Sequence, residues 1–269
     1  MMPTERTHAE RFQTERFHLA GAEVLVGADL DETIRIAAGQ FAALARKLAS
    51  EGRPVHVALS GGSTPRRLFQ ALAGEPFASL VPWLSVHFFW GDERNVPPNH
   101  PDSNYAAARE LLLSRVPVPA ANIHRILTGD TTAMEASDFY ERTVREKVPA
   151  ASALPCFDYV LLGLGANGHT ASLFPHRPTL HETRRLVVAD HVEEINAWRV
   201  TLTAPVFNNA AQVTFLVTGE EKAPVVHRVL EGPRDAESIP AQLIAPAHGT
   251  LTWILDSAAA SLLTRPPGS

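Results

Sequence analysis

The hydrophobic positions of the chain follow two alternating patterns. Short apolar runs, typical of buried strands, occur at residues 23–27, 55–60, 86–90, 157–163, 185–189, 199–203, 213–219 and 251–256. Between several of these runs lie segments whose apolar residues recur at helical spacing. Strands that alternate with helices are typical of a parallel sheet covered on both faces. The pattern therefore predicts an α/β fold with a doubly wound, mostly parallel, Rossmann-like sheet and helices on both faces.

Two long helices are predicted from their ends as well as from their periodicity. The first begins after Asp29, an N-cap residue followed by Glu32 at the capping-box position, and ends at Gly52. Its apolar stripe consists of Ile34, Ala38, Phe41, Ala45 and Leu48. The second predicted helix spans residues 131–148.

Composition and charge narrow the class of protein. The chain has 269 residues, 45% of them hydrophobic, and neither a repeat nor a long linker. We therefore expect a single domain over residues 18–264, with frayed ends at residues 1–17 and 265–269. A formal net charge of −5 with interspersed signs offers no basic stripe, which argues against a nucleic-acid partner.

The chain shows no sign of a membrane or a secretory location. No stretch approaches the roughly 20 apolar residues of a membrane span, and the first residues lack the apolar core of a signal peptide. The single cysteine, Cys156, cannot form an internal disulfide, which suits a reducing compartment. These features predict a cytoplasmic protein without a membrane partner.

The first of three unusual strand-to-helix turns consists of Ser60, Gly61, Gly62, Ser63 and Thr64. Such turns matter because ligands of open α/β sheets collect beyond the carboxyl ends of the strands. Pro65 stands at the first helical position, which proline favours, and Ser63 or Thr64 is the expected cap. Free backbone N–H groups and the helix dipole would make this turn a phosphate site. An ordinary capped turn explains the same residues equally well.

The second turn leaves a strand at Gly91 and continues through a proline-rich loop to Ser103, a predicted helix cap. Long irregular loops in compact domains are often functional. Arg94 carries a planar fork of donors suited to a phosphate or a carbonyl oxygen. The alternative is that Asp92 and Glu93 pair with Arg94 or cap turns.

The third turn contains a literal G-x-G-x-x-G, formed by Gly163, Gly165 and Gly168. A dinucleotide site would need a full helix after the third glycine, but Pro175 stops any helix soon afterwards. The pattern instead predicts a tight glycine turn at the end of a strand, followed by a short helix that carries His169 in its first turn. There the helix dipole would keep the imidazole neutral and able to accept a proton.

Other catalytic templates are absent from the sequence. It contains no H-E-x-x-H or C-x-x-C, and its other histidines lack ligand spacing, so we expect neither a metal nor a cofactor. It contains no G-x-S-x-G, so a hydrolase built on this chain would use activated water.

Six segments together resemble the 6-phosphogluconolactonases, within the larger group that includes the glucosamine-6-phosphate deaminases. They are ALSGGSTP, WGDERNVPPNHPDSNY, LLGLGANGHTASLFP, WRVTLTAPVFNNA, VTGEEKA and LTWILDSAA. The resemblance as a whole extends over residues 22–263. The resemblance implies metal-free hydrolysis of 6-phospho-D-glucono-1,5-lactone to 6-phospho-D-gluconate in the pentose phosphate pathway. The implied partner is a sugar-phosphate lactone, and the oligomeric state, monomer or dimer, stays open.

The resemblance also implies roles for individual residues. Carried over, His169 is the general base and Arg94 a catalytic basic residue. The residues implied to bind phosphate and substrate are Gly61, Gly62, Ser63, Thr64, Arg199 and Lys222. Those implied to hold the turn and orient the base are Gly165, Asn167 and Gly168. Without the resemblance, Lys222 would indicate solvated surface and Arg199 a structural ion pair.

The sequence departs from the family at Asn167, where family members commonly have aspartate. An asparagine can still fix the turn and donate a hydrogen bond, but no role that needs a carboxylate can operate there.

Two competing functions can be weighed against the sequence. An amino sugar phosphate isomerase or deaminase would need acids two residues before and five after the histidine, where this chain has Asn167 and Phe174. A non-catalytic sugar-phosphate sensor would need a helix-turn-helix module, for which the segment before the first strand is too short.

Overall fold

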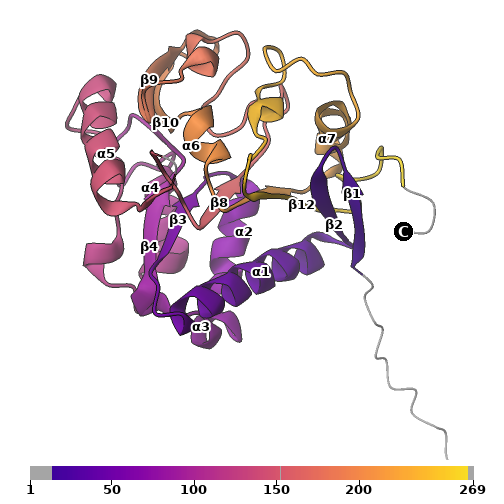
Figure 1. The fold of residues 1–269 in the computed structure, drawn as a ribbon, viewed down its shortest axis with the longest axis horizontal. Helices are drawn as coiled ribbons and strands as arrows, with labels where there is room; N and C mark the ends of the chain where they lie inside the picture. The colour runs from indigo at the N-terminus through magenta and orange to yellow at the C-terminus, as the bar shows by residue number, and fades with distance from the viewer. Residues whose placement is uncertain (1–13, 152, 266–269) are drawn as a thin grey trace, which may run out of the picture.

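The main sheet of the protein has seven strands in the order β1-β2-β12-β11-β8-β3-β4 (Figure 1). The structure is a computed structural model that describes residues 14–151 and 153–265. The strands are β1 (Glu15–Leu19), β2 (Ala22–Gly27), β3 (Val55–Leu59), β4 (Val86–Trp90), β8 (Tyr159–Leu162), β11 (Gln212–Val217) and β12 (Thr250–Asp256). All neighbours are parallel except β1 and β2, so the predicted mostly parallel sheet is confirmed.

Helices pack on both faces of this sheet, as the alternating pattern predicts. Figure 1 shows α1 and α2 on one side and α6 and α7 on the other. The helices are α1 (Leu30–Ser50), α2 (Ser63–Leu72), α3 (Phe77–Leu80), α4 (Asn104–Ala108), α5 (Ala133–Lys147), α6 (Ala204–Asn208) and α7 (Ala223–Leu230). The buried apolar side chains between these layers form the core.

The first long helix begins after Asp29 as predicted, and the second begins at Ala133, two residues after its predicted start. In α1 the Asp29 carboxylate accepts a hydrogen bond of 2.8 Å from the backbone N–H of Glu32, and Glu32 Oε2 accepts one of 2.7 Å from the N–H of Ala28. In α5 a complete capping box joins Thr132 and Glu135. At both helix starts, side chains satisfy N–H groups that have no partner inside the helix.

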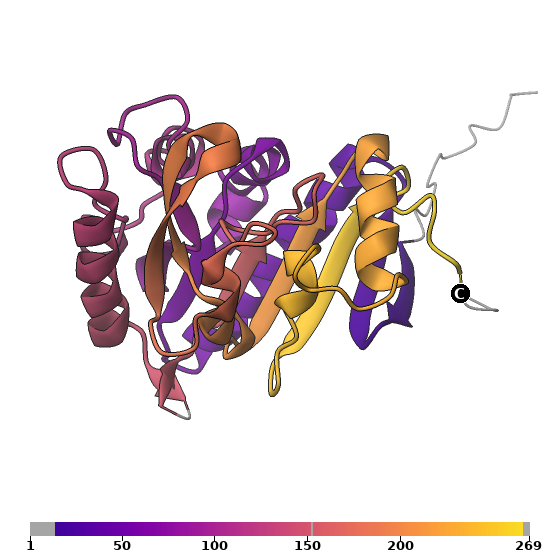
Figure 2. The ribbon, with the colours of Figure 1, turned by 90° about the horizontal axis from the view of Figure 1, so that it is seen from above.

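A second sheet of three strands departs from the prediction. It consists of β5 (Asp92–Arg94), β10 (Ala197–Leu202) and β9 (Val187–Val192), all antiparallel, and it lies beside the main sheet (Figure 2). The apolar runs at 185–189 and 199–203 do form strands, but not in the parallel sheet. Only residues 193–196 separate β9 from β10, and so short a connection can join antiparallel strands only. A further small hairpin joins β6 (Ala150–Ala151) and β7 (Leu154–Pro155).

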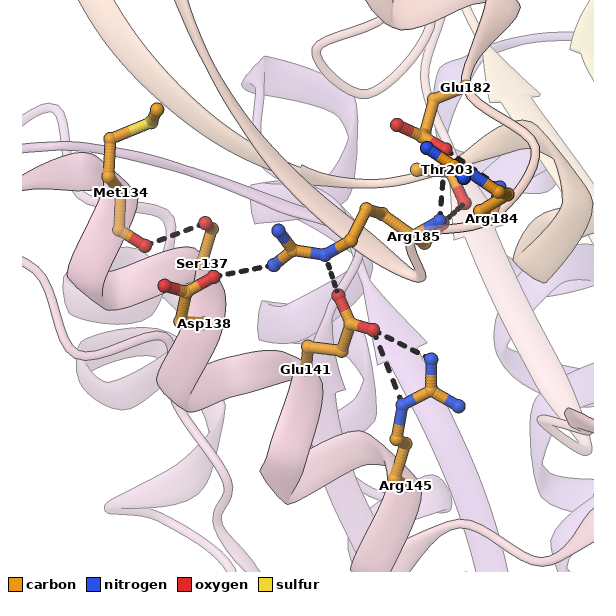
Figure 3. Close-up of polar contacts among 9 residues, drawn as sticks. All are labelled: Met134, Ser137, Asp138, Glu141, Arg145, Glu182, Arg184, Arg185 and Thr203. Carbon is orange, nitrogen blue, oxygen red and sulfur yellow. Dashed lines mark hydrogen bonds and ion pairs between the residues drawn. The ribbon is translucent and has the colours of Figure 1, made fainter.

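An arginine network fixes the three-stranded sheet to α5 (Figure 3). Just before β9, Arg185 donates hydrogen bonds of 2.6 Å each to Glu141 and Asp138 of α5. Arg145 donates a further bond of 2.7 Å to Glu141. Burial alone would raise the pKa of Glu141, but the bonds from the two arginines outweigh burial and lower it. The network holds the sheet that carries Arg199.

The folded part of the chain extends beyond the predicted bounds of 18–264. Residues 15–17 belong to β1, and Phe17 is only 5% exposed, so the expectation of a frayed segment up to Phe17 is wrong for these residues. Arg265 forms an ion pair of 2.6 Å with Glu15. The remaining predicted ends, residues 1–13 and 266–269, lie outside the described residues. Within residues 14–151 and 153–265, no helix is long and apolar enough to cross a membrane.

Candidate active site

The three turns singled out in the sequence meet at one cavity of about 250 Å³, beyond the carboxyl ends of β3, β4 and β8. Its lining includes six of the predicted site residues: Gly61, Gly62, Arg94, Gly165, His169 and Lys222. A smaller cavity of about 110 Å³ adjoins it, shares Lys222 and both glycines of the first turn, and reaches Ser63 and Thr64. A larger cavity of about 380 Å³ near β12 is lined mainly by apolar side chains and lacks a comparable group of charges. This cavity and two others of about 660 Å³ each contain none of the predicted site residues, so the first two cavities form the candidate site.

His169 follows β8 and is held with its Nε2 atom available as a proton acceptor. Asn167 Oδ1 accepts a hydrogen bond of 3.2 Å from the backbone N–H of His169, and the same oxygen lies 2.6 Å from His169 Nδ1. Because that oxygen can only accept, Nδ1 carries the proton and Nε2 keeps its lone pair. The imidazole ring stacks on Phe174 at a centroid distance of 4.4 Å. It also lies so close to Gly165 that a β-carbon there would overlap the ring.

The helix predicted after Gly168 is absent, so the reason given for a neutral histidine is wrong. Residues 166–168 form a turn, and Thr170 pairs with Leu173 in an isolated bridge. Thr170 Oγ1 donates a hydrogen bond of 2.8 Å to the carbonyl of Gly163, seven residues earlier, which ties this segment back to the residue that follows β8.

The imidazole of His169 is nevertheless neutral at pH 7, as expected. Burial lowers its pKa to about 4. The nearby charge of Asp92 opposes this change, while Lys222, Arg199 and Arg94 add to it. The ring is therefore ready to accept a proton, for a physical reason other than the one predicted.

The first turn forms an open helix N-terminus instead of a capped one. The N-cap of α2 is Gly62, with a φ of 111° and no side-chain hydrogen bond, so the prediction that Ser63 or Thr64 caps the helix is wrong. Both residues lie in the first turn of α2, where Thr64 Oγ1 is 2.9 Å from Thr218 Oγ1. Since no side chain occupies this end of α2, its first N–H groups face the smaller cavity and can bind an anion.

Arg94 and Lys222 line these cavities, Arg199 lies beside Arg94, and the hydrogen bonds of all three cations go to neutral carbonyl oxygens. Arg94 and Arg199 are directly opposite in the β5–β10 register. Arg94 Nη1 donates 2.7 Å to the carbonyl of Asp102, and Lys222 Nζ donates 2.9 Å to that of Leu164. Burial, with the charge of Arg94, lowers the pKa of Arg199, which is not among the residues that line either cavity. Among the described residues none of the three cations has an ion-pair partner, so the site favours an anionic ligand.

Neither acid of the second turn forms an ion pair with Arg94 in the described structure. Glu93, 1% exposed, accepts backbone N–H bonds from Arg94, Asn104 and Tyr105, and so fulfils the expected capping role. Burial raises the pKa of Glu93 despite these bonds. Ser103 caps α4 as predicted.

Asp92 and Asn104 are among the cavity side chains to which sequence reasoning gave no site role. Asp92 Oδ2 accepts a bond of 2.6 Å from Ser172 Oγ, and Asp92 Oδ1 accepts one of 3.2 Å from Asn104 Nδ2. The signal for Asp92 was its position two residues after the apolar run at residues 86–90. Its sequence context indicated only an ion-pair partner of Arg94 or a turn cap.

The structure gives no context for a dinucleotide or a metal. The third glycine of G-x-G-x-x-G, Gly168, is followed by turns, and no crossover helix begins there. Within the described part of the chain, no group of three or more His, Cys, Asp or Glu side chains is arranged to hold a metal ion.

Comparisons with known proteins show which family this chain resembles. Residues 28–253 match the family model described as glucosamine-6-phosphate isomerases/6-phosphogluconolactonase. A 6-phosphogluconolactonase of Haemophilus influenzae is 40% identical over 210 residues, which are 78% of this chain and 88% of that protein. One from Nostoc is 38% identical over 247 residues, 87% of this chain and 100% of the relative. The solved 6-phosphogluconolactonase of Trypanosoma brucei superposes with a TM-score of 0.82 at 30% identity, covering 92% of this chain and 100% of that chain.

Proposed function

Because this chain belongs to the glucosamine-6-phosphate isomerase and 6-phosphogluconolactonase family, we propose that its cavity opens the ring ester of 6-phospho-D-glucono-1,5-lactone with His169 as the base. Its activity is that of a 6-phosphogluconolactonase, an enzyme of sugar-phosphate metabolism. The observation that carries the mechanism is the convergence of a neutral histidine, Arg94 and Lys222 with an open helix N-terminus.

His169 acts first, on a water molecule. Its Nε2 accepts a proton from the water while the water oxygen forms a bond to C1 of the lactone. The N–H at Nδ1 stays hydrogen-bonded to Asn167, which keeps the ring in the productive tautomer and orientation. The carbonyl oxygen of the lactone gains the negative charge.

Arg94 stabilises that developing oxyanion. Its Nε–H is buried and has no hydrogen-bond partner among the described residues, so a donor is available without breaking a bond. When the tetrahedral intermediate collapses, the bond between C1 and the ring oxygen breaks, and the ring oxygen takes the proton from His169. The products are the open-chain acid and the neutral histidine, so no cofactor enters the balance.

The phosphate binds in the smaller cavity. There the first N–H groups of α2 and the Lys222 ammonium surround a space next to the larger cavity. The helix dipole and the lysine both favour a group of charge near −2. Anchoring the phosphate in this way places C1 beside His169. The binding energy of the phosphate then holds the reacting carbon in the orientation that the reaction needs.

The amino sugar phosphate alternative would need acids at positions 167 and 174, and neither residue there is an acid. Asn167 is an amide bound to His169, and Phe174 is an aromatic ring stacked on it. The test is a pair of assays on the purified protein. Acid release from freshly made 6-phosphogluconolactone should exceed the spontaneous rate, and glucosamine 6-phosphate should release no ammonia. The reverse pattern would overturn the proposal.

We predict that Asn167→Asp keeps kcat within about tenfold of the native value at pH 8 and moves the acidic limb of the kcat profile to higher pH. A carboxylate in place of the amide, 2.6 Å from Nδ1, would favour the imidazolium and raise the pKa of His169 from about 4. At pH 8 the ring would still be mostly neutral. The measurement is kcat from pH 4 to 9.

Asn196→Asp is the matched control, because it adds the same charge in the exposed turn between β9 and β10 and should leave the limb in place. A rise of about 10²-fold or more in kcat at pH 8 for Asn167→Asp would contradict the prediction. It would mean that the amide leaves the active site without a group that it needs.

We also propose that the enzyme acts in the cytoplasm, as a monomer or a dimer. Its one cysteine, Cys156, is a free thiol, which suits a reducing compartment.

A further inference from the structure

Asp92 places a buried carboxylate at the wall of the active cavity. The residue is 5% exposed and is held by bonds from Ser172 Oγ and Asn104 Nδ2, both neutral donors. It is the only acidic side chain among the residues that line the two cavities. Among the described residues no lysine, arginine or histidine forms an ion pair with it. Burying a carboxylate without an ion-pair partner costs desolvation free energy. A charge kept at that cost beside the active cavity indicates a functional role.

The surroundings of Asp92 show that the fold is built to keep this group in place. Gly61 of the phosphate turn has no β-carbon, and one placed there would overlap the Asn104 side chain. Asn104 Nδ2, in the space so created, donates both to the backbone carbonyl of Asp92 and to its carboxylate. Ser172, which also binds the carboxylate, lies three residues after His169. The three turns of the site are therefore joined at Asp92.

Four charged side chains act on His169 from the surrounding elements. Arg94 and Asp92 belong to β5, Arg199 to β10, and Lys222 to the short turn before α7. Three are positive and oppose the imidazolium, whereas Asp92 alone favours it. Asn167, which is bound to the imidazole, is an uncharged amide, so Asp92 is the sole negative charge among them.

We propose that Asp92 is the counter-charge of His169, a positioning residue that stabilises the imidazolium while the histidine holds the proton taken from water. It acts through His169 and needs no contact with the substrate. The inference rests on the proposed lactonase mechanism, because an imidazolium forms only if His169 is the base. Its consequence is that the tautomer and the charge of His169 are controlled from two different turns, by the Asn167 amide and by the Asp92 carboxylate.

The first test is Asp92→Asn, which keeps the size of the side chain and removes its charge. We expect kcat for 6-phosphogluconolactone to fall by about tenfold or more at pH 8, with KM within several-fold of native. Glu93→Gln is the matched control, since it removes a neighbouring buried carboxylate that does not line the cavity. It is expected to lower the melting temperature without moving the acidic limb of the kcat profile.

The second test is rescue by a carboxylate on the other side of the histidine. In Asn167→Asp the acidic limb lies at higher pH, where it is measurable, and adding Asp92→Asn should move the limb back to lower pH. The loss of kcat caused by Asp92→Asn should also be several-fold smaller in this background than in the native chain. A purely structural role predicts the same loss in both backgrounds and an unmoved limb.

The outcomes separate this inference from the proposed function. Equal losses in both backgrounds, an unmoved limb, or failure of both Asp92 variants to fold would overturn the role of Asp92 while leaving the lactonase assignment intact. A native protein that does not accelerate lactone hydrolysis, or a His169→Ala variant that does so as well as the native chain, would instead overturn the mechanism on which the inference rests.

Discussion

His169→Ala is expected to lower kcat for 6-phosphogluconolactone by about 10²-fold or more while leaving KM within several-fold of native. The imidazole Nε2 is the acceptor for the proton of the attacking water, whereas the phosphate anchor lies in the adjoining cavity and does not depend on the imidazole ring. Steady-state kinetics at pH 8, corrected for spontaneous hydrolysis, provides the measurement.

His248→Ala is the control for this experiment. His248 is an exposed histidine in the loop before β12, away from the cavity, and its loss should change neither constant. A His169→Ala variant that retains most of its kcat would rule out His169 as the base. An increase confined to KM would mean that the ring contributes only to binding.

Removing the phosphate from the substrate is expected to have an effect of similar size. We predict that kcat/KM for 6-phosphogluconolactone exceeds that for unphosphorylated gluconolactone by at least about 10²-fold. Charge-assisted hydrogen bonds contribute about 1.5–3 kcal/mol each, and the plain lactone would lose those from Lys222 and from the first turn of α2. The measurement is a competition of the two lactones at equal concentration.

A charge-removing variant sharpens this prediction. Lys222→Met should reduce the preference for the phosphorylated lactone and leave kcat/KM for the plain one nearly unchanged, because only the former offers an anion to the lysine. Equal use of both lactones by the native enzyme would mean that the residues from Gly61 to Thr64 form only a turn.

Local sequence signals predicted the elements that depend on local physics. Asp29 caps α1 and Thr132 begins α5 with a capping box, and the bonds of both are made within four residues of the chain. The apolar runs became strands because burial on both faces requires continuous apolar residues. The meeting of the three turns also followed, since parallel strands end on the same edge of the sheet.

What the sequence did not reveal depends on contacts between distant segments. The β1–β2 hairpin turns at Ala20 and Gly21, both with positive φ, without the asparagine–glycine signal that marks most such turns. No helix forms after Gly168, because Thr170 and Ser172 bond to groups elsewhere in the site. The bond from Ser172 to Asp92 joins residues 80 positions apart in the chain, which no local pattern could indicate.

The central claim is that His169 is a neutral base with its proton on Nδ1, and nitrogen-15 NMR of the imidazole tests it most directly. The His169 signals can be assigned by their absence from the His169→Ala spectrum. Burial and the surrounding cations predict a neutral ring with a protonated Nδ1 and a pKa of about 4. The nitrogen-15 signals of the ring should therefore stay the same from pH 8 down to about pH 5. A pKa at or above the ordinary value of about 6.5, or a proton on Nε2 at neutral pH, would contradict the account.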